Sequence, residues 1–195
     1  MNAIAARRRA TAWLAAACVA VLAGCATPRL PGVGGEGDGS LSRTGRFAVR
    51  VDEADGRQQA VQGGFAWRDD GRRLTLDLAN PLGSTLARVE VADGAATLRR
   101  SDGSVEQAPD ADSLVEQALG SPIPVSGLRD WMRGRLAAAP AAEPSRDAQG
   151  RPAAFVQGGW AVRLSRYDAA GPLLLSMERQ EAGRRISVRL VADPS

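Results

Sequence analysis

Hydrophobic and polar residues alternate along most of the chain after residue 45, and this pattern predicts half-buried β-strands. In the first such run, Phe47, Val49 and Val51 share one face. Turn signals such as Asp55-Gly56 and Asp93-Gly94 separate successive runs. Further alternating runs lie at 61–67, 74–78, 87–91, 154–157, 160–164, 173–177 and 186–190. Such regular spacing is typical of an antiparallel meander that curls or closes.

Two short helices are predicted between the strands. Residues 110–120 begin with acidic residues and end in glycine, as helices commonly do. Pro122-Ile123-Pro124 then requires an extended link. We expect Ser126 to cap a second helix over residues 127–133.

The order of these elements predicts a mainly β fold with short α-helices. Residues 137–152 are rich in Ala, Pro, Asp and Gly, and we expect a loop there. The economical arrangement is a single curved antiparallel sheet whose concave face is covered by the two helices. Such a sheet encloses a core, a cavity, or both.

The N-terminus has the features of a bacterial lipoprotein signal. Arg7, Arg8 and Arg9 precede a short apolar run over residues 10–23, which is typical of a signal peptide. The run ends in Leu22-Ala23-Gly24-Cys25, which resembles a lipobox. We therefore expect a signal peptide over residues 1–24 and lipidation of Cys25.

The residues after Cys25 predict a tether and a location. Residues 25–44 are rich in Gly and Pro and are expected to link the lipid flexibly to a domain over 45–192. Ala26 is not the aspartate that commonly retains such proteins at the inner membrane. We expect a lipid-anchored protein of the outer membrane, with its domain facing the periplasm.

Charge and composition exclude several classes of function. The chain has no histidine, and its 25 basic residues are all arginine, which removes His-based catalysis and lysine Schiff bases. Three of these arginines precede Cys25, so the mature chain carries 22 arginines against 22 acidic residues. A net charge near zero argues against a nucleic-acid ligand.

The acidic residues and serines predict neither an enzyme nor a metal site. The pairs Asp52/Glu53 and Asp69/Asp70 flank turns and are expected to be solvated. Asp110 and Asp112 suit a helix N-terminus better than a metal. Ser126 has no histidine or lysine to activate it. We expect no catalytic residue, no metal and no cofactor.

One turn between two strands presents a large apolar residue. Asn80, Pro81 and Gly83 occupy favoured positions of a type I turn, which places Leu82 at its third position, facing solvent. Two readings are open from the turn alone. Leu82 either serves a function at the apex, or it is harmlessly exposed or folded back on a neighbouring element.

Several segments resemble the LolB family of outer-membrane lipoprotein receptors, over most of residues 45–192. The most specific are Leu78-Ala79-Asn80-Pro81-Leu82-Gly83-Ser84-Thr85 and the stretch from Gly120 to Trp131, which contains Pro-Ile-Pro and Leu-Arg-x-Trp. Gly45-Arg46-Phe47-Ala48-Val49, Phe65-Ala66-Trp67, Gly159-Trp160 and Tyr167 also fit. The departures are the Ala- and Pro-rich stretch 137–145 and the long Gly-rich tether.

The resemblance implies an unclosed β-barrel with helices as a lid over an apolar cavity. It implies a monomeric carrier that accepts triacylated lipoproteins from a LolA-like periplasmic carrier and inserts them into the inner leaflet of the outer membrane. It also implies that Leu82, flanked by Pro81 and Gly83, protrudes and is needed for insertion.

Strand parity and helix faces then predict which residues line the cavity and hold the acyl chains. They are Phe47, Val49, Phe65, Trp67, Leu76, Leu78, Leu114, Leu119, Leu128, Trp131, Trp160 and Val162. Two alternatives remain open at this point. One is an envelope lipoprotein that carries another lipid or small apolar ligand, and the other is a structural lipoprotein with a filled core.

Overall fold

The computed structural model describes residues 39–92, 94–120 and 122–195. The chain divides into two units, Met1–Gly35 and Glu36–Ser195, and all described residues belong to the second. The predicted signal peptide, Cys25 and most of the predicted tether therefore lie outside the described residues.

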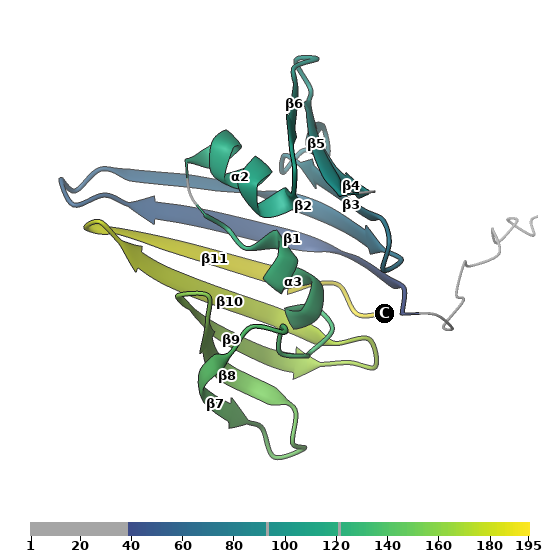
Figure 1. Cartoon of the computed structure of the whole chain (residues 1–195), viewed down its shortest axis with the longest axis vertical. Coiled ribbons are helices and arrows are strands. Elements are labelled where there is room, and N and C mark those ends of the chain that lie inside the picture. The colour runs from purple at the N-terminus through teal and green to yellow at the C-terminus, as the bar shows by residue number, and fades with distance from the viewer. Residues whose placement is uncertain (1–38, 93, 121) are drawn as a thin grey trace, which may run out of the picture. The chain divides into compact units, whose positions relative to one another are not determined.

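The described residues form one antiparallel sheet and two helices (Figure 1). The strands run β6-β5-β4-β3-β2-β1-β11-β10-β9-β8-β7 across the sheet. Their bounds are β1 (Leu41–Asp52), β2 (Gln58–Asp69), β3 (Leu74–Ala79), β4 (Thr85–Ala92), β5 (Ala95–Arg100), β6 (Val105–Ala108), β7 (Ala141–Arg146), β8 (Pro152–Gln157), β9 (Trp160–Tyr167), β10 (Pro172–Glu181) and β11 (Arg184–Ala192).

The sheet is a meander whose first and last strands meet in the middle. Apart from β1 and β11, neighbouring strands in the sheet are consecutive in the sequence. In the β1–β11 pair, Phe47 lies opposite Leu190 and Val49 opposite Val188. The edges β6 and β7 do not pair with each other, so the barrel is open. The predicted fold class, an unclosed and curved antiparallel sheet, is confirmed.

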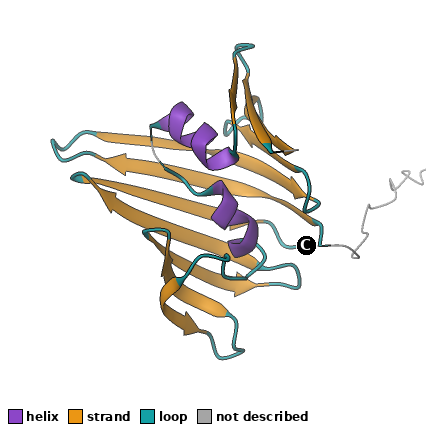
Figure 2. Ribbon diagram, viewed as in Figure 1, coloured by secondary structure: helices purple, strands orange, loops and turns teal. Residues whose placement is uncertain are grey.

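Two helices cross one face of the sheet between its two edge strands (Figure 2). Helix α2 (Ala111–Leu119) begins after Asp110, whose carboxylate accepts a hydrogen bond from the Ser113 N–H. It ends at Gly120 in the left-handed region, at φ 63°. Both ends agree with the sequence signals, because an acidic cap and a C-terminal glycine satisfy backbone groups that the helix leaves unpaired.

Helix α3 (Val125–Trp131) is capped differently from the expectation. It begins before Ser126, so Ser126 lies in its first turn. The Ser126 N–H donates to Asp112 Oδ1 at 2.8 Å, and its hydroxyl is also hydrogen-bonded to Asp112. A side chain of α2 thus caps α3, which only the packing of the two helices can arrange.

Two predicted boundaries differ from the structure. β1 begins at Leu41, not at residue 45, because Leu41 and Arg43 are both buried and pair with β2. The expected loop at 137–152 contains β7, which pairs with β8. Its register is irregular, and it carries Pro144 at the sheet edge, where a proline is tolerated. The composition of residues 137–152 therefore did not indicate the strand that the structure shows there.

The core follows the predicted parity on the central strands. Phe47, Phe65, Trp67, Ile186 and Val188 point to the helix side and are buried. Among the described residues, no helix is both long and apolar enough to span a membrane.

Candidate functional site

An apolar cavity of about 210 Å³ lies between the helices and the central sheet. Every residue that lines it is hydrophobic. The lining consists of Phe47, Val49, Val61, Phe65, Trp67, Leu76, Leu78, Leu86, Val89, Val115, Ile123, Val125, Leu128, Met132, Val188 and Leu190. The cavity can therefore hold only a group that requires no hydrogen bonds from the protein.

Strand period and helix position explain this lining. Strands β1, β2, β3 and β11 present alternate residues to the helix side, so each contributes a row of apolar side chains. Val115 of α2 and Leu128 of α3 face these rows, with Ile123 from the link between the helices. The cavity exists where the curved sheet and the short helices do not fill the space between them.

Seven of the predicted lining residues line this cavity: Phe47, Val49, Phe65, Trp67, Leu76, Leu78 and Leu128. Four others do not. Leu114 and Val162 are buried in the filled core, and Trp131 and Trp160 line a different pocket. The side chain of Leu119 lies outside the described residues.

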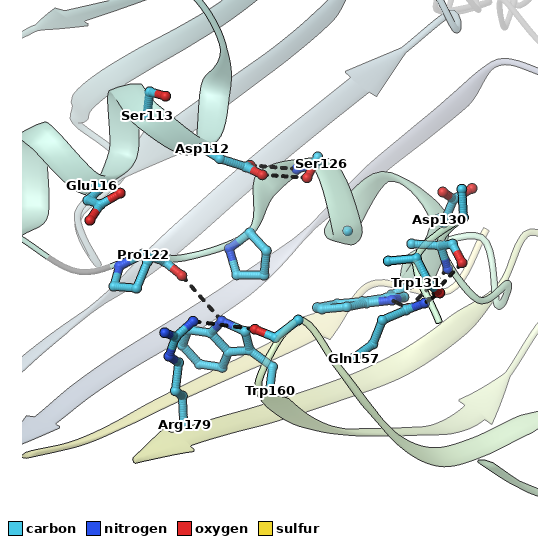
Figure 3. Close-up of a pocket in the computed structure, with 16 residues that line it drawn as sticks. Asp112, Ser113, Glu116, Pro122, Ser126, Asp130, Trp131, Gln157, Trp160 and Arg179 are labelled. Carbon is cyan, nitrogen blue, oxygen red and sulfur yellow. Dashed lines mark hydrogen bonds between the residues drawn. The ribbon is translucent and has the colours of Figure 1, made fainter. Parts of the chain in front are cut away.

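Trp131 and Trp160 attach the helices to the sheet through their indole N–H groups (Figure 3). Trp131 Nε1 donates to Gln157 Oε1 at 2.8 Å, and Trp160 Nε1 donates to the Pro122 carbonyl at 3.2 Å. Both side chains border a second pocket of about 550 Å³, whose lining also includes Asp112 and Arg179. The indole N–H groups of these two tryptophans are thus paired, and both side chains lie outside the apolar cavity.

Nine lining residues escaped the prediction: Val61, Leu86, Val89, Val115, Ile123, Val125, Met132, Val188 and Leu190. Val61, Val89, Val188 and Leu190 share faces with predicted rows, so strand parity was a sufficient signal for them. Leu86 breaks that parity and had no signal in the sequence.

The turn between β3 and β4 holds Leu82 away from the rest of the fold. The Gly83 N–H donates to the Asn80 carbonyl at 2.9 Å, and Asn80 Oδ1 accepts from the N–H groups of Leu82 and Ser84. The Leu82 side chain is 91% exposed. The turn is closed by its own backbone and by Asn80, so the exposed leucine is not needed to form it.

The chain matches the family model described as "Outer membrane lipoprotein LolB" over residues 40–194. It belongs to the LolB family. The outer-membrane lipoprotein LolB of Bordetella petrii is 61% identical over 184 residues, covering 93% of this chain and 92% of that protein. Its namesakes from Bordetella pertussis and Cupriavidus pinatubonensis are 58% and 39% identical, with coverage of 98% and 96% of both chains.

In this LolB-family chain, α3 is fastened to the end of β2 by a buried carboxylate. Asp69 accepts hydrogen bonds from Arg129 Nη2 at 2.5 Å, Arg133 Nη1 at 2.7 Å and the Gly71 N–H at 2.9 Å. Burial alone would raise the pKa of Asp69, but the hydrogen bonds from Arg129, Arg133 and Gly71 lower that pKa to about 2. The carboxylate is therefore ionised and paired wherever the protein is folded near neutral pH.

A second buried ion pair ties β1 to the turn between β9 and β10. Arg43, which is buried, donates to both oxygens of Asp168 at 2.5 and 2.7 Å. The hydrogen bonds from Arg43 hold the pKa of Asp168 well below its usual value; partial burial raises that pKa, and hydrogen bonds from Ser195 lower it further. Ion pairs thus stabilise the end of the sheet where β1 begins and β2 ends.

The expectation that the acidic pairs are solvated is wrong for Asp69, which is buried in ion pairs with Arg129 and Arg133. The other acidic residues considered for chemistry are engaged in turns and helix ends. Asp52 accepts from Arg50 Nε, and Asp70 accepts from the N–H groups of Arg72 and Arg73. Asp110 caps α2 and Asp112 caps α3. In the part of the chain that the structure describes, no cluster of three potential metal ligands occurs.

Proposed function

We propose that this chain accepts triacylated lipoproteins from a LolA-like periplasmic carrier and inserts them into the inner leaflet of the outer membrane. The observation that carries the proposal is a cavity without polar lining beneath the two helices, in a member of the LolB family. Such a cavity suits the acyl chains of a client lipoprotein and no polar substrate. We therefore propose a carrier and not an enzyme.

The free energy of burying acyl chains favours their transfer from the carrier through this protein to the membrane. Burying a methylene group stabilises it by about 0.8 kcal/mol, so a dry apolar surface is sufficient to bind a lipid. A bilayer buries the whole acyl chain and therefore binds it more strongly than the cavity does. Transfer from carrier to receptor to membrane then runs downhill, and the receptor step needs no nucleotide.

The cavity is so small that it must enlarge when cargo enters. At about 210 Å³ it is smaller than ordinary ligand pockets, which begin near 300 Å³. Helix α3 is hydrogen-bonded to Asp69 and Gln157, whereas α2 packs on β5 and β6 and is hydrogen-bonded to α3 through Asp112 and Ser126. We propose that α2 shifts to admit acyl chains while α3 stays in place.

The anchor completes the proposed arrangement. We propose that Cys25 is lipidated after removal of residues 1–24, and that the following residues connect the lipid to the domain. The domain would act as a monomer on the periplasmic side of the outer membrane. Pro81, Leu82 and Gly83 would then touch the bilayer or the departing acyl chains.

A reconstituted transfer assay tests the proposal. Full-length acylated protein in liposomes is mixed with a LolA-like carrier loaded with a triacylated lipoprotein, and cargo is followed from the carrier into the lipid. We expect transfer of acylated cargo and none of an unacylated control. Failure to remove cargo from the carrier, with another lipid found in the purified protein by mass spectrometry, would contradict the proposal.

A further inference from the structure

Exposed hydrophobic side chains mark the mouth of the apolar cavity. Among the residues that the structure describes, four large hydrophobic side chains are exposed: Val61, Leu82, Leu86 and Val105. Val61 and Leu86 also line the cavity, with 55% and 36% of their surfaces accessible. A side chain that is both exposed and cavity-lining lies at an opening. The opening is therefore bounded by the first half of β2 and the start of β4.

Leu86 reaches this opening because of a β-bulge. Ala87, Val89 and Val91 face the helix side, so regular alternation would turn Leu86 to the opposite face. Leu78 pairs with Ala87, but Ala79 pairs with Thr85, which leaves Leu86 as an extra residue in β4. A bulge re-aims the inserted side chain, and here it adds a leucine to the cavity wall.

The turn that carries Leu82 is close to this opening along the chain. Leu86 follows Leu82 by four residues, a separation of at most roughly 14 Å even for an extended chain. On the other side, Gly63 allows the end of β3 to approach β2, since a Cβ at Gly63 would lie 1.9 Å from the Ala79 oxygen. Val61 is two residues before this contact. The turn that carries Leu82 therefore adjoins the parts of β2 and β4 that contain Val61 and Leu86.

We infer that Val61 and Leu86 form an apolar track along which acyl chains pass between the cavity and Leu82. The inference rests on the proposed function and deepens it. A chain that crossed this opening over polar surface would expose methylene groups to water, and each one lowers the population of the crossing state about fourfold. An apolar track lowers the barrier to delivery without strengthening the final binding site.

Polar substitutions at the track test the inference in the full-length acylated protein reconstituted in liposomes. The probe is a fluorescent triacylated lipoprotein on a LolA-like carrier. Cargo crosslinked to the receptor measures acceptance, and cargo free in the lipid measures delivery. For Leu86→Ser we expect delivery to slow by roughly three- to tenfold, since part of one leucine contact is lost. For Val61→Ser we expect delivery to slow about threefold. Because both residues also line the cavity, acceptance should fall in both variants, but less than delivery.

Control variants separate the track from general effects. Val105→Ser changes the fourth exposed hydrophobic residue, which does not line the cavity, and it should deliver normally. Leu86→Met should restore delivery, and each variant is checked for an unchanged melting temperature. Normal delivery by Leu86→Ser, or an equal loss of acceptance and delivery, would overturn the track. If unsubstituted protein takes no cargo from the carrier, the proposed function itself is wrong.

Discussion

The two ends of strand β2 border the same apolar cavity but differ in how far their residues are buried. At one end, Asp69 is buried and bound by Arg129 of α3 and by Arg133, which follows α3, and Trp67 beside it lines the cavity. At the other end, Val61 lines the cavity and is largely exposed. About 20 Å of strand separates Val61 from Trp67.

This difference indicates a closed end and an open end. Buried ion pairs with good geometry resist opening, because removing one partner leaves an uncompensated charge. Exposed apolar side chains make few native contacts, so they add little resistance to opening. The closed end should therefore control stability, and the open end should control delivery with little effect on stability.

The strongest test of the closed end removes its carboxylate. Asp69→Ala removes the carboxylate that is paired with Arg129 and Arg133 and should lower the free energy of unfolding by about 2–4 kcal/mol. Urea denaturation followed by tryptophan fluorescence measures this change. Glu178→Gln, at an exposed carboxylate on β10, is the control and should stay within about 0.5 kcal/mol. Equal stability of the two variants would show that the ion pairs do not hold this end.

Two adjacent glycines in the middle of β2, between its closed and open ends, test the close approach of β3 to β2. A Cβ on Gly63 would collide with the backbone oxygen of Ala79, whereas a Cβ on Gly64 would meet only the Gly45 oxygen at 3.7 Å. Gly63→Ala should destabilise the protein by up to about 3 kcal/mol, since the end of β3 must move. Gly64→Ala should change stability much less. Thermal unfolding of both variants decides, and similar melting temperatures would refute the close approach.

The pH dependence of stability isolates the charge of Asp69. Its pKa is about 2 in the folded protein and near 3.8 when unfolded, so the unfolded chain binds more protons between these values. The stabilisation is complete above pH 4 and is lost as the pH falls towards 2, by about 2 kcal/mol. Asp69→Asn should lack this portion of the decline. Parallel slopes for both proteins in acid denaturation would contradict the prediction.

The smallest effect on stability is expected at the open end. Leu82→Glu should change the free energy of unfolding by less than about 0.5 kcal/mol, because the side chain is almost fully exposed. Losing the insertion of one leucine, worth about 1.5–3 kcal/mol, should slow delivery roughly ten- to a hundredfold while acceptance persists. Liposome transfer and calorimetry measure the two quantities. A melting temperature several degrees lower, or normal delivery, would refute this role for Leu82.

Local patterns in the sequence were sufficient for much of this structure. Strand parity placed Phe47, Phe65 and Trp67 on the helix side, because side chains alternate wherever a strand is regular. The ends of α2 followed from Asp110 and Gly120, which act on their own backbone neighbours. The Asn80–Gly83 turn likewise needs only its own hydrogen bonds.

Other features depend on residues that meet only in the folded chain. Trp131 and Trp160 lie outside the predicted cavity and are hydrogen-bonded to Gln157 and to the Pro122 carbonyl, which are distant in the sequence. The cap of α3 comes from Asp112 on another helix. Leu86 joins the cavity through a bulge, which is a property of how β4 pairs with β3. Alternation and capping act within a few residues and can be read in the sequence, whereas these contacts arise when distant segments pack and satisfy one another's polar groups.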